Sequence, residues 1–195
     1  MKPKRKKKIS STKKSKRIRS GEVLSAGFGG QGIMFMGKLL AQAGLLAGKN
    51  VTWMPSYGAE VRGGTAYSMT KISDREIASP IVTNPDALIV MNKPSLLKYS
   101  ERVKEGGLLI SNRSLIDNFK KRKNISLINL PLTEMASKLG DIKCANMIAL
   151  GAFLKKTKML SIKNAADALK DMLKGKEELF KINKKALEKG YNAVK

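Results

Sequence analysis

The sequence contains no histidine, a single cysteine and few aromatic residues. Without histidine the chain cannot form a Ser-His-Asp or Cys-His nucleophile or an HExxH metal site. One cysteine, Cys144, excludes an internal disulfide framework, a CxxC redox pair and an iron–sulfur ligand set built from this chain alone. We expect Cys144 to be a buried, small apolar side chain rather than a nucleophile. Any catalysis must use Lys, Tyr, Glu, Asp or a cofactor held elsewhere.

Long apolar runs are also missing. No stretch approaches the roughly 18 to 20 apolar residues that a membrane-spanning helix needs, and the charged N-terminus leads into no apolar signal segment. The sequence therefore predicts a cytoplasmic protein with no membrane contact.

Acidic residues are scarce relative to basic ones, and the net charge is +24. Eleven of the 39 Lys and Arg residues lie in residues 1–20, which contain no acid and little to bury. We predict a disordered basic tail over 1–20 and one domain over 21–195. The tail is a solvated extension or a contact for nucleic acid, an acidic partner subunit or an import receptor. With aromatics at only 5% and no zinc or helix-turn-helix pattern, nucleic-acid binding is kept only as the alternative function from another class.

From residue 22 the apolar periodicity alternates between strand and helix. Strands are expected over 23–26, 50–54, 66–72, 87–91, 108–111 and 126–130, and helices over 33–47, 94–103, 132–139, 145–154, 161–173 and 177–194. We predict a single Rossmann-like α/β domain with a mostly parallel sheet flanked by helices, and an amphipathic helical pair at the C-terminus. Residues 22–54 are expected to form one β-α-β unit whose two strands pair in parallel.

The first expected strand ends in a glycine-rich turn, Gly27-Phe-Gly-Gly-Gln-Gly32, directly before a helix. Glycines permit positive φ and close approach, and a helix N-terminus adds free N–H donors, so the turn is a candidate anion site. The spacing fits G-x-G-x-x-G, but no acid follows the second strand to bind a ribose. This argues against NAD or FAD, and a free-standing NAD-dependent enzyme is a third alternative. Tight strand–helix packing is the structural explanation of the same glycines.

A second glycine-rich loop follows Pro55 and contains Tyr57, Glu60 and Arg62. Both loops should lie at the carboxyl ends of their strands, where open α/β sheets bind ligands. The planar fork of Arg62 suits a carboxylate or a phosphate, and Glu60 could orient it. We therefore expect the two loops to form one ligand-facing surface.

These motifs carry a resemblance. The turn at 27–32, Val51-Thr-Trp-Met-Pro-Ser-Tyr-Gly-Ala-Glu-Val-Arg-Gly-Gly64 and Ser79-Pro-Ile-Val-Thr-Asn-Pro-Asp86 resemble the gamma subunit of the 2-oxoacid:ferredoxin oxidoreductases. The likeness covers roughly residues 21–194. Within the loop, Ser56-Tyr57-Gly58 and Arg62-Gly63-Gly64 are most similar to the 2-oxoglutarate branch, while the pyruvate and branched-chain branches tend to carry a Phe-Phe-Gly form there. The pyruvate or branched-chain branch is the alternative within the family.

The resemblance implies a role within a complex. Such enzymes use thiamine diphosphate, Mg, iron–sulfur clusters and coenzyme A to convert a 2-oxoacid into acyl-CoA, CO2 and reduced ferredoxin; for 2-oxoglutarate the product is succinyl-CoA. This chain is expected to bind no cofactor alone, to supply no catalytic or metal-binding residue, and to assemble with alpha, beta and delta-type subunits that deliver electrons to ferredoxin. It should help form the substrate and coenzyme A site. The residues expected there are Gly27, Phe28, Gly29, Gly30, Gln31, Gly32, Ser56, Tyr57, Gly58, Glu60, Arg62, Gly63 and Gly64.

Overall fold

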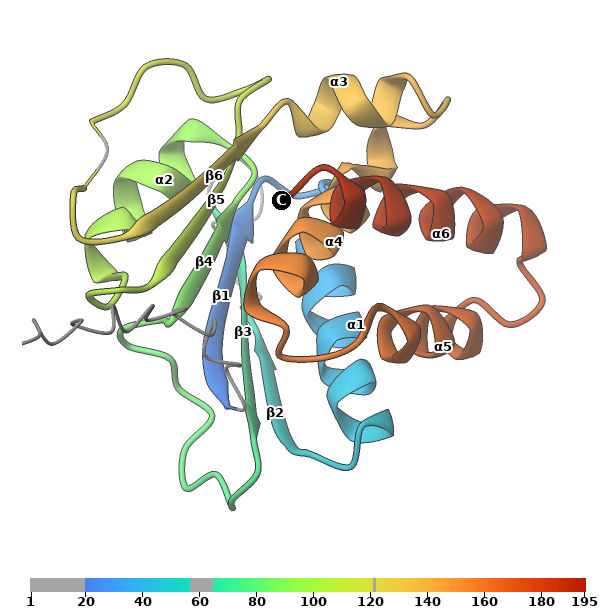
Figure 1. Ribbon diagram of the computed structural model, residues 1–195, viewed down its shortest axis with the longest axis horizontal. Coiled ribbons are helices and arrows are strands. Elements are labelled where there is room, and N and C mark those ends of the chain that lie inside the picture. Colours follow the sequence, from blue (N-terminus) through green and yellow to red (C-terminus); the bar gives the residue numbers. More distant parts are fainter. Residues whose placement is uncertain (1–19, 57–64, 121) are drawn as a thin grey trace, which may run out of the picture.

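In the computed structural model the chain forms one six-stranded sheet between two layers of helices (Figure 1). The structure describes residues 20–56, 65–120 and 122–195. The strands are β1 (Gly21–Gly27), β2 (Asn50–Pro55), β3 (Ala66–Ser73), β4 (Ala87–Val90), β5 (Leu108–Asn112) and β6 (Ser126–Leu130). Their order across the sheet is β2-β3-β1-β4-β5-β6. The predicted α/β fold with a mostly parallel sheet is confirmed.

The pairing of β1 with β2 was predicted wrongly. β3 lies between them and pairs antiparallel with both, with Val23 opposite Thr70 and Trp53 opposite the same residue. β1, β4, β5 and β6 pair in parallel. Because β2 and β1 are each antiparallel to β3, they still run in the same direction, and their carboxyl ends lie at one edge of the sheet.

The helices divide unequally between the two faces (Figure 1). α1 (Ile33–Leu46), α4 (Ala145–Thr157), α5 (Ile162–Met172) and α6 (Glu177–Asn192) lie on one side, and α2 (Lys93–Tyr99) lies on the other. α3 (Leu132–Ser137) and the 3-10 turns η2 (Ser100–Arg102) and η3 (Ile142–Cys144) complete the described helices. The helix expected over 94–103 is thus a shorter α-helix continued by a 3-10 turn. Asn92 begins it by accepting a hydrogen bond from the Ser95 N–H, at 2.8 Å.

Side chains of the central strands alternate between two apolar cores, as the two-residue period of a strand requires. Val23, Ile89 and Ile110 belong to the larger core, under α1 and α4. Leu24, Leu88 and Leu109 belong to the smaller core, under α2. Burial on both faces explains why β4 reads as a continuous apolar run.

α4 and α6 cross in backbone contact. A Cβ on Gly151 would lie 2.0 Å from the Leu187 carbonyl oxygen, and one on Gly190 would lie 1.9 Å from the Ile148 carbonyl oxygen. Only glycine allows this approach, so the crossing fixes α4 firmly against the C-terminal helix. Cys144 precedes α4 and is buried, as predicted.

Among the residues that the structure describes, no helix is long and apolar enough to cross a membrane. Ser20, the first described residue, is exposed, and its hydroxyl accepts a hydrogen bond from the Asp74 N–H at 3.2 Å. The basic tail predicted for residues 1–20 lies outside the described residues except for this serine.

Candidate functional site

The glycine-rich turn lies at the carboxyl edge of the sheet, the upper edge in Figure 1. β1 ends at Gly27 and α1 begins at Ile33, so residues 28–32 make the turn. β2 ends at Pro55 on the same edge, which brings Ser56 near the turn. The antiparallel β3 between them begins at this edge with Ala66.

Backbone conformation explains part of the glycine pattern. Gly30 has a φ of 89° and Gly32 a φ of 69°, a region that strongly favours glycine. Gly27 has ordinary strand geometry, but a Cβ there would lie 2.5 Å from the Gln31 Oε1 atom and 3.0 Å from the Met91 Cβ. Gly27 is therefore required by close packing, whereas Gly30 and Gly32 are required by the shape of the turn.

Gln31 points back into the turn. Its Oε1 accepts a hydrogen bond from the Phe28 N–H at 2.7 Å, and its Nε2 donates to the Met91 carbonyl at 3.4 Å. The Gln31 N–H also donates to the Phe28 carbonyl at 3.3 Å. The side chain of this predicted binding residue is thus occupied in closing the turn.

The N-terminus of α1 carries no side-chain cap. Gly32 is the N-cap residue, and the first helical turn contains no acidic side chain. The first N–H groups of a helix have no partner within the helix and lie at the positive end of its dipole. In this helix they are left for water or for an anion.

A cavity of about 360 Å³ opens beside the turn. It is lined by the turn and the start of α1 together with the ends of β2 and β3, namely Phe28, Gly29, Gly30, Gly32, Ile33, Met34, Phe35, Ser56 and Ala66. Most of the side chains are apolar, while the backbone of the turn is polar. The cavity therefore offers apolar contact and hydrogen-bond donors side by side.

A second cavity of about 240 Å³ lies across the turn and shares Gly30, Gly32 and Phe35 with the first. Its remaining lining comes from η3, α4 and the C-terminal helices: Asp141, Lys143, Cys144, Asn146, Leu173, Leu179 and Asn183. Sequence reasoning missed this side of the turn. The available signal was Asn146, a polar residue in the largely apolar segment predicted as a helix over 145–154.

The Cys144 side chain beside this cavity is buried, and its thiol is not a reactive nucleophile. It is 1% exposed, and its Sγ lies 2.9 Å from the Asp141 carbonyl oxygen, to which it donates. Burial, and then the negative charge of Asp141, raise the pKa of the Cys144 thiol. The group is a protonated thiol at neutral pH.

Of the predicted site residues, Phe28, Gly29, Gly30, Gly32 and Ser56 line one cavity. Gly27 and Gln31 lie behind them and support the turn. The others, Tyr57, Gly58, Glu60, Arg62, Gly63 and Gly64, lie outside the described residues. A binding role for any of these residues stays a prediction.

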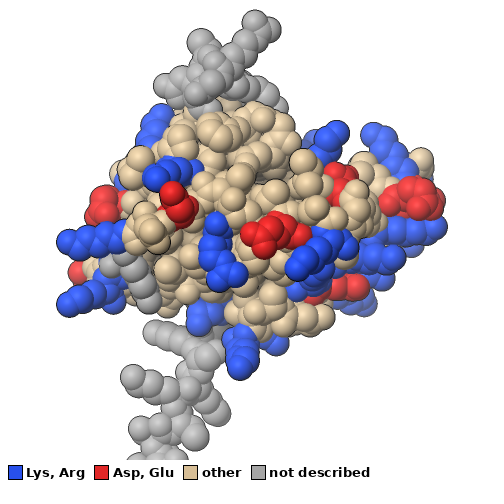
Figure 2. Space-filling model, turned by 90° about the horizontal axis from the view of Figure 1, so that it is seen from above, with Lys and Arg blue, Asp and Glu red and all other residues tan. Residues whose placement is uncertain are grey.

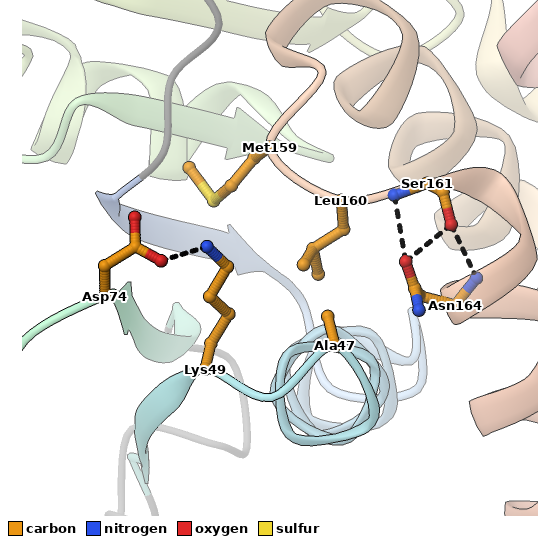
Figure 3. A pocket seen from close by; sticks show the side chains of 7 residues that line it. All are labelled: Ala47, Lys49, Asp74, Met159, Leu160, Ser161 and Asn164. Atoms are coloured by element: carbon orange, nitrogen blue, oxygen red, sulfur yellow. Dashed lines mark hydrogen bonds and ion pairs between the residues drawn. The ribbon is translucent and has the colours of Figure 1, made fainter.

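The opposite edge of the sheet holds a larger cavity, of about 590 Å³ (Figure 3). Its polar lining is already paired: Lys49 with Asp74, and Ser161 with Asn164 in the capping box of α5. It lies at the amino ends of the parallel strands, where α/β sheets do not bind their ligands. We therefore place the candidate site at the glycine turn.

Figure 2 looks onto the carboxyl edge. Lys and Arg side chains gather on the right, over the C-terminal helices, with a few acidic side chains among them. Further Lys and Arg side chains lie on the left, and the middle of this face carries both basic and acidic side chains next to an uncharged area. The basic side chains on both sides of this edge give it a positive surround, which a ligand or partner would meet.

Topology adds a second argument against a dinucleotide. In a dinucleotide-binding fold the ribose-binding acid follows a parallel strand beside the first one. Here the neighbour on that side of β1 is the antiparallel β3, and β2 is followed by Ser56. The described residues also contain no group of three or more His, Cys, Asp or Glu that could hold a metal ion.

Fold and site together define an α/β domain whose first helix begins at an uncapped glycine turn. The family described as "Pyruvate ferredoxin/flavodoxin oxidoreductase" matches residues 22–193. The chain belongs to this family, as its three motifs predicted.

The relatives are named for different oxoacids: 2-oxoglutarate, ketoisovalerate and, in common gamma subunits, pyruvate together with ketoisovalerate. The chain is 38% identical to the 2-oxoglutarate synthase subunit KorC of Methanothermobacter marburgensis, over 77% of this chain and 84% of that protein. It is also 38% identical to the ketoisovalerate oxidoreductase subunit VorA of the same organism, over 89% of this chain. The chain spans only about a third of the length of the VorA relatives, 36% and 34%.

Solved structures have the same fold. A keto/oxoacid ferredoxin oxidoreductase gamma subunit from Geobacter sulfurreducens is 30% identical, with a TM-score of 0.77 over 88% of this chain and 96% of that one. The 2-oxoglutarate:ferredoxin oxidoreductase of Magnetococcus marinus gives a TM-score of 0.81 over 92% of this chain and 32% of that one. At 23% identity the latter likeness concerns the fold alone.

Proposed function

We propose that this chain is the gamma subunit of a multi-subunit 2-oxoacid:ferredoxin oxidoreductase that acts on 2-oxoglutarate. The full-length match to KorC proteins supports this assignment, with 94% of the Methanocaldococcus jannaschii protein covered at 35% identity. The loop at 56–64 supports the same branch. With one cysteine in the sequence, this chain cannot ligate an iron–sulfur cluster alone, and in this assignment the clusters and thiamine diphosphate belong to the partner subunits.

We further propose that the glycine turn helps to bind coenzyme A. The observation that carries this role is the cavity in which uncapped backbone N–H groups meet Phe28, Ile33 and Phe35. Coenzyme A combines several phosphates with a long uncharged pantetheine arm, so it needs both kinds of contact. The positive surround of this edge raises the local concentration of such an anion.

Steady-state kinetics of the purified complex test the substrate. Ferredoxin reduction should require coenzyme A, and kcat/KM should be highest for 2-oxoglutarate among 2-oxoglutarate, 2-oxoisovalerate and pyruvate. The equal identity to VorA makes the branched-chain oxoacid the second candidate. A higher kcat/KM for 2-oxoisovalerate would replace our assignment by that one.

Arg62→Ala tests the ligand role of the second loop. We expect a roughly tenfold higher KM for coenzyme A or the oxoacid in an intact complex, because a charge-assisted contact is lost. Arg75→Ala is the matched control, because it removes the same charge from an exposed arginine at the opposite edge of the sheet. Unchanged KM values for Arg62→Ala in an assembled complex would contradict the proposal.

A further inference from the structure

Asn146, near the start of α4, contacts the glycine turn from a point 114 residues further along the chain. Its Nδ2 donates a hydrogen bond to the Gly32 carbonyl at 3.0 Å. Its Oδ1 accepts from the Met147 N–H at 2.8 Å, and the side chain is almost completely buried. Both polar ends are used, so the amide has one orientation.

The contact is made at the residue where the turn becomes a helix. The Gly32 carbonyl also accepts the first hydrogen bond of α1, from the Met36 N–H at 2.9 Å. A Cβ on Gly32 would lie 2.1 Å from the Asn146 Nδ2 atom. The Asn146 amide therefore packs so closely against the turn that it leaves no room for a side chain at position 32. This is a second reason for glycine there, in addition to its positive φ.

α4 is a rigid base for this contact. Residues 145–154 are all buried, and Gly151 holds the helix in backbone contact with α6. The turn by contrast lies at the surface, with Phe28, Gly29 and Gly30 exposed. A surface turn keeps a ligand-ready geometry only when a fixed element supports it.

We propose that Asn146 is a positioning residue, which holds the Gly32 carbonyl and thereby aims the N–H groups of the glycine turn and of the α1 N-terminus at the coenzyme A phosphates. This inference rests on the proposed function. Asn146 itself does not touch the ligand. It acts by keeping the donors of the turn in the geometry that binds an anion.

The test is Asn146→Ala in the assembled complex. Asn183→Ala is the matched control, because Asn183 is also buried and lines the same cavity, but donates to the Leu179 carbonyl, at 2.7 Å. We expect Asn146→Ala to raise the KM for coenzyme A about tenfold and to change kcat less than twofold, with faster hydrogen exchange in residues 27–36. Asn183→Ala should leave both readouts within twofold. Asn146→Ser, which keeps a polar group but cannot reach as far, guards against loss of folding and should also raise the KM.

Arg62→Ala distinguishes a failure of the positioning role of Asn146 from a failure of the proposed function. If it raises the KM for coenzyme A while both Asn146 variants leave the KM unchanged, the positioning role is overturned and the proposed function stands. If Asn183→Ala raises the KM as much as Asn146→Ala, the effect is general damage to the cavity, and the positioning role is again overturned. If no variant raises the KM, coenzyme A binding at this edge is contradicted together with the role of Asn146.

Discussion

The two edges of the sheet are held together by different chemistry. At the amino edge, ion pairs join β1 to β3 and to the loop before β5, with Glu22 accepting from Lys71 at 2.7 Å and from Lys104 at 3.0 Å. At the carboxyl edge, neutral amides donate to carbonyls, and Gln31 and Asn112 share the Met91 carbonyl, both at 3.4 Å. The difference teaches which edge stabilises the fold and which one is available to a ligand.

Charge pairing at the amino edge is mutual. Lys104 also contacts Asp86 at 3.0 Å, and Asp86 accepts from the Glu22 N–H at 2.8 Å. These charged groups have partners within the domain, so the edge has little electrostatic attraction left for a ligand. The carboxyl edge uses amides for support and leaves the α1 N-terminus without a side-chain cap. Variants of the carboxyl edge should thus alter ligand KM, and variants of the amino edge should alter stability and its pH dependence.

Gly32→Ala is expected to have the largest effect. The new Cβ would be strained at positive φ and would displace the Asn146 amide, a combined cost of about 3 kcal/mol in the free energy of unfolding. Urea denaturation of the purified chain measures this cost. The KM for coenzyme A should also rise in any complex that assembles. A stable variant with an unchanged KM would contradict the ligand role that we assign to the carboxyl edge.

Gly30→Ala should cost less and separate strain from contact. Gly30 has a φ of 89° but nothing within 4 Å of its Cβ position, so only backbone strain of about 1 kcal/mol is expected. Because Gly30 lines the cavity proposed for coenzyme A, the added methyl group should still raise the KM for coenzyme A. Gly48→Ala, also at positive φ with open space around it, is the matched control and should leave the KM unchanged.

Glu22→Gln tests the amino edge. Burial alone would raise the pKa of Glu22, but hydrogen bonds and charges from Lys71 and Lys104 outweigh it and hold the pKa below its usual value of 4.5. Burial would lower the pKa of Lys104, and its bonds to Asp86 and Glu22 raise it above 10.5 instead. We expect the variant to lose about 1 kcal/mol at neutral pH, because solvent partly screens the charges. The KM for coenzyme A should not change.

The pH dependence follows from the signs of these shifts. The contribution of Glu22 is present above pH 4.5 and is lost as the pH falls through its lower folded-state pKa. The contribution of Lys104 is present below pH 10.5 and is lost as the pH rises through its higher folded-state pKa. Denaturation of wild type and Glu22→Gln at several pH values should show their difference shrinking in acid. A constant difference would mean that the Glu22 charge does not act as described.

The local pattern of apolar residues was sufficient to predict the strands and helices of this fold, but not which strands lie next to one another in the sheet. The apolar periodicity located each described strand and major helix to within a few residues, because burial of a face repeats along the sequence. The position of β3 between β1 and β2 could not be read in this way, because strand pairing depends on residues far apart in the chain. The hydrogen bond of the Gln31 side chain with the Met91 carbonyl was not predicted, because the two residues are 60 positions apart in the sequence. Asn146 was missed for the same reason.

Lys49→Ala should have the smallest effect and tests whether the amino-edge cavity is only structural. Lys49 pairs with Asp74 at the rim of this cavity, and the Asp74 side chain is 46% exposed (Figure 3). Pairs of this kind contribute at most about 0.5 kcal/mol, and salt weakens them. We therefore expect a small loss of stability that disappears at about 1 M NaCl, with unchanged kcat and KM. A raised KM for any substrate would show that the amino edge also serves a ligand, and the division between the two edges would fail.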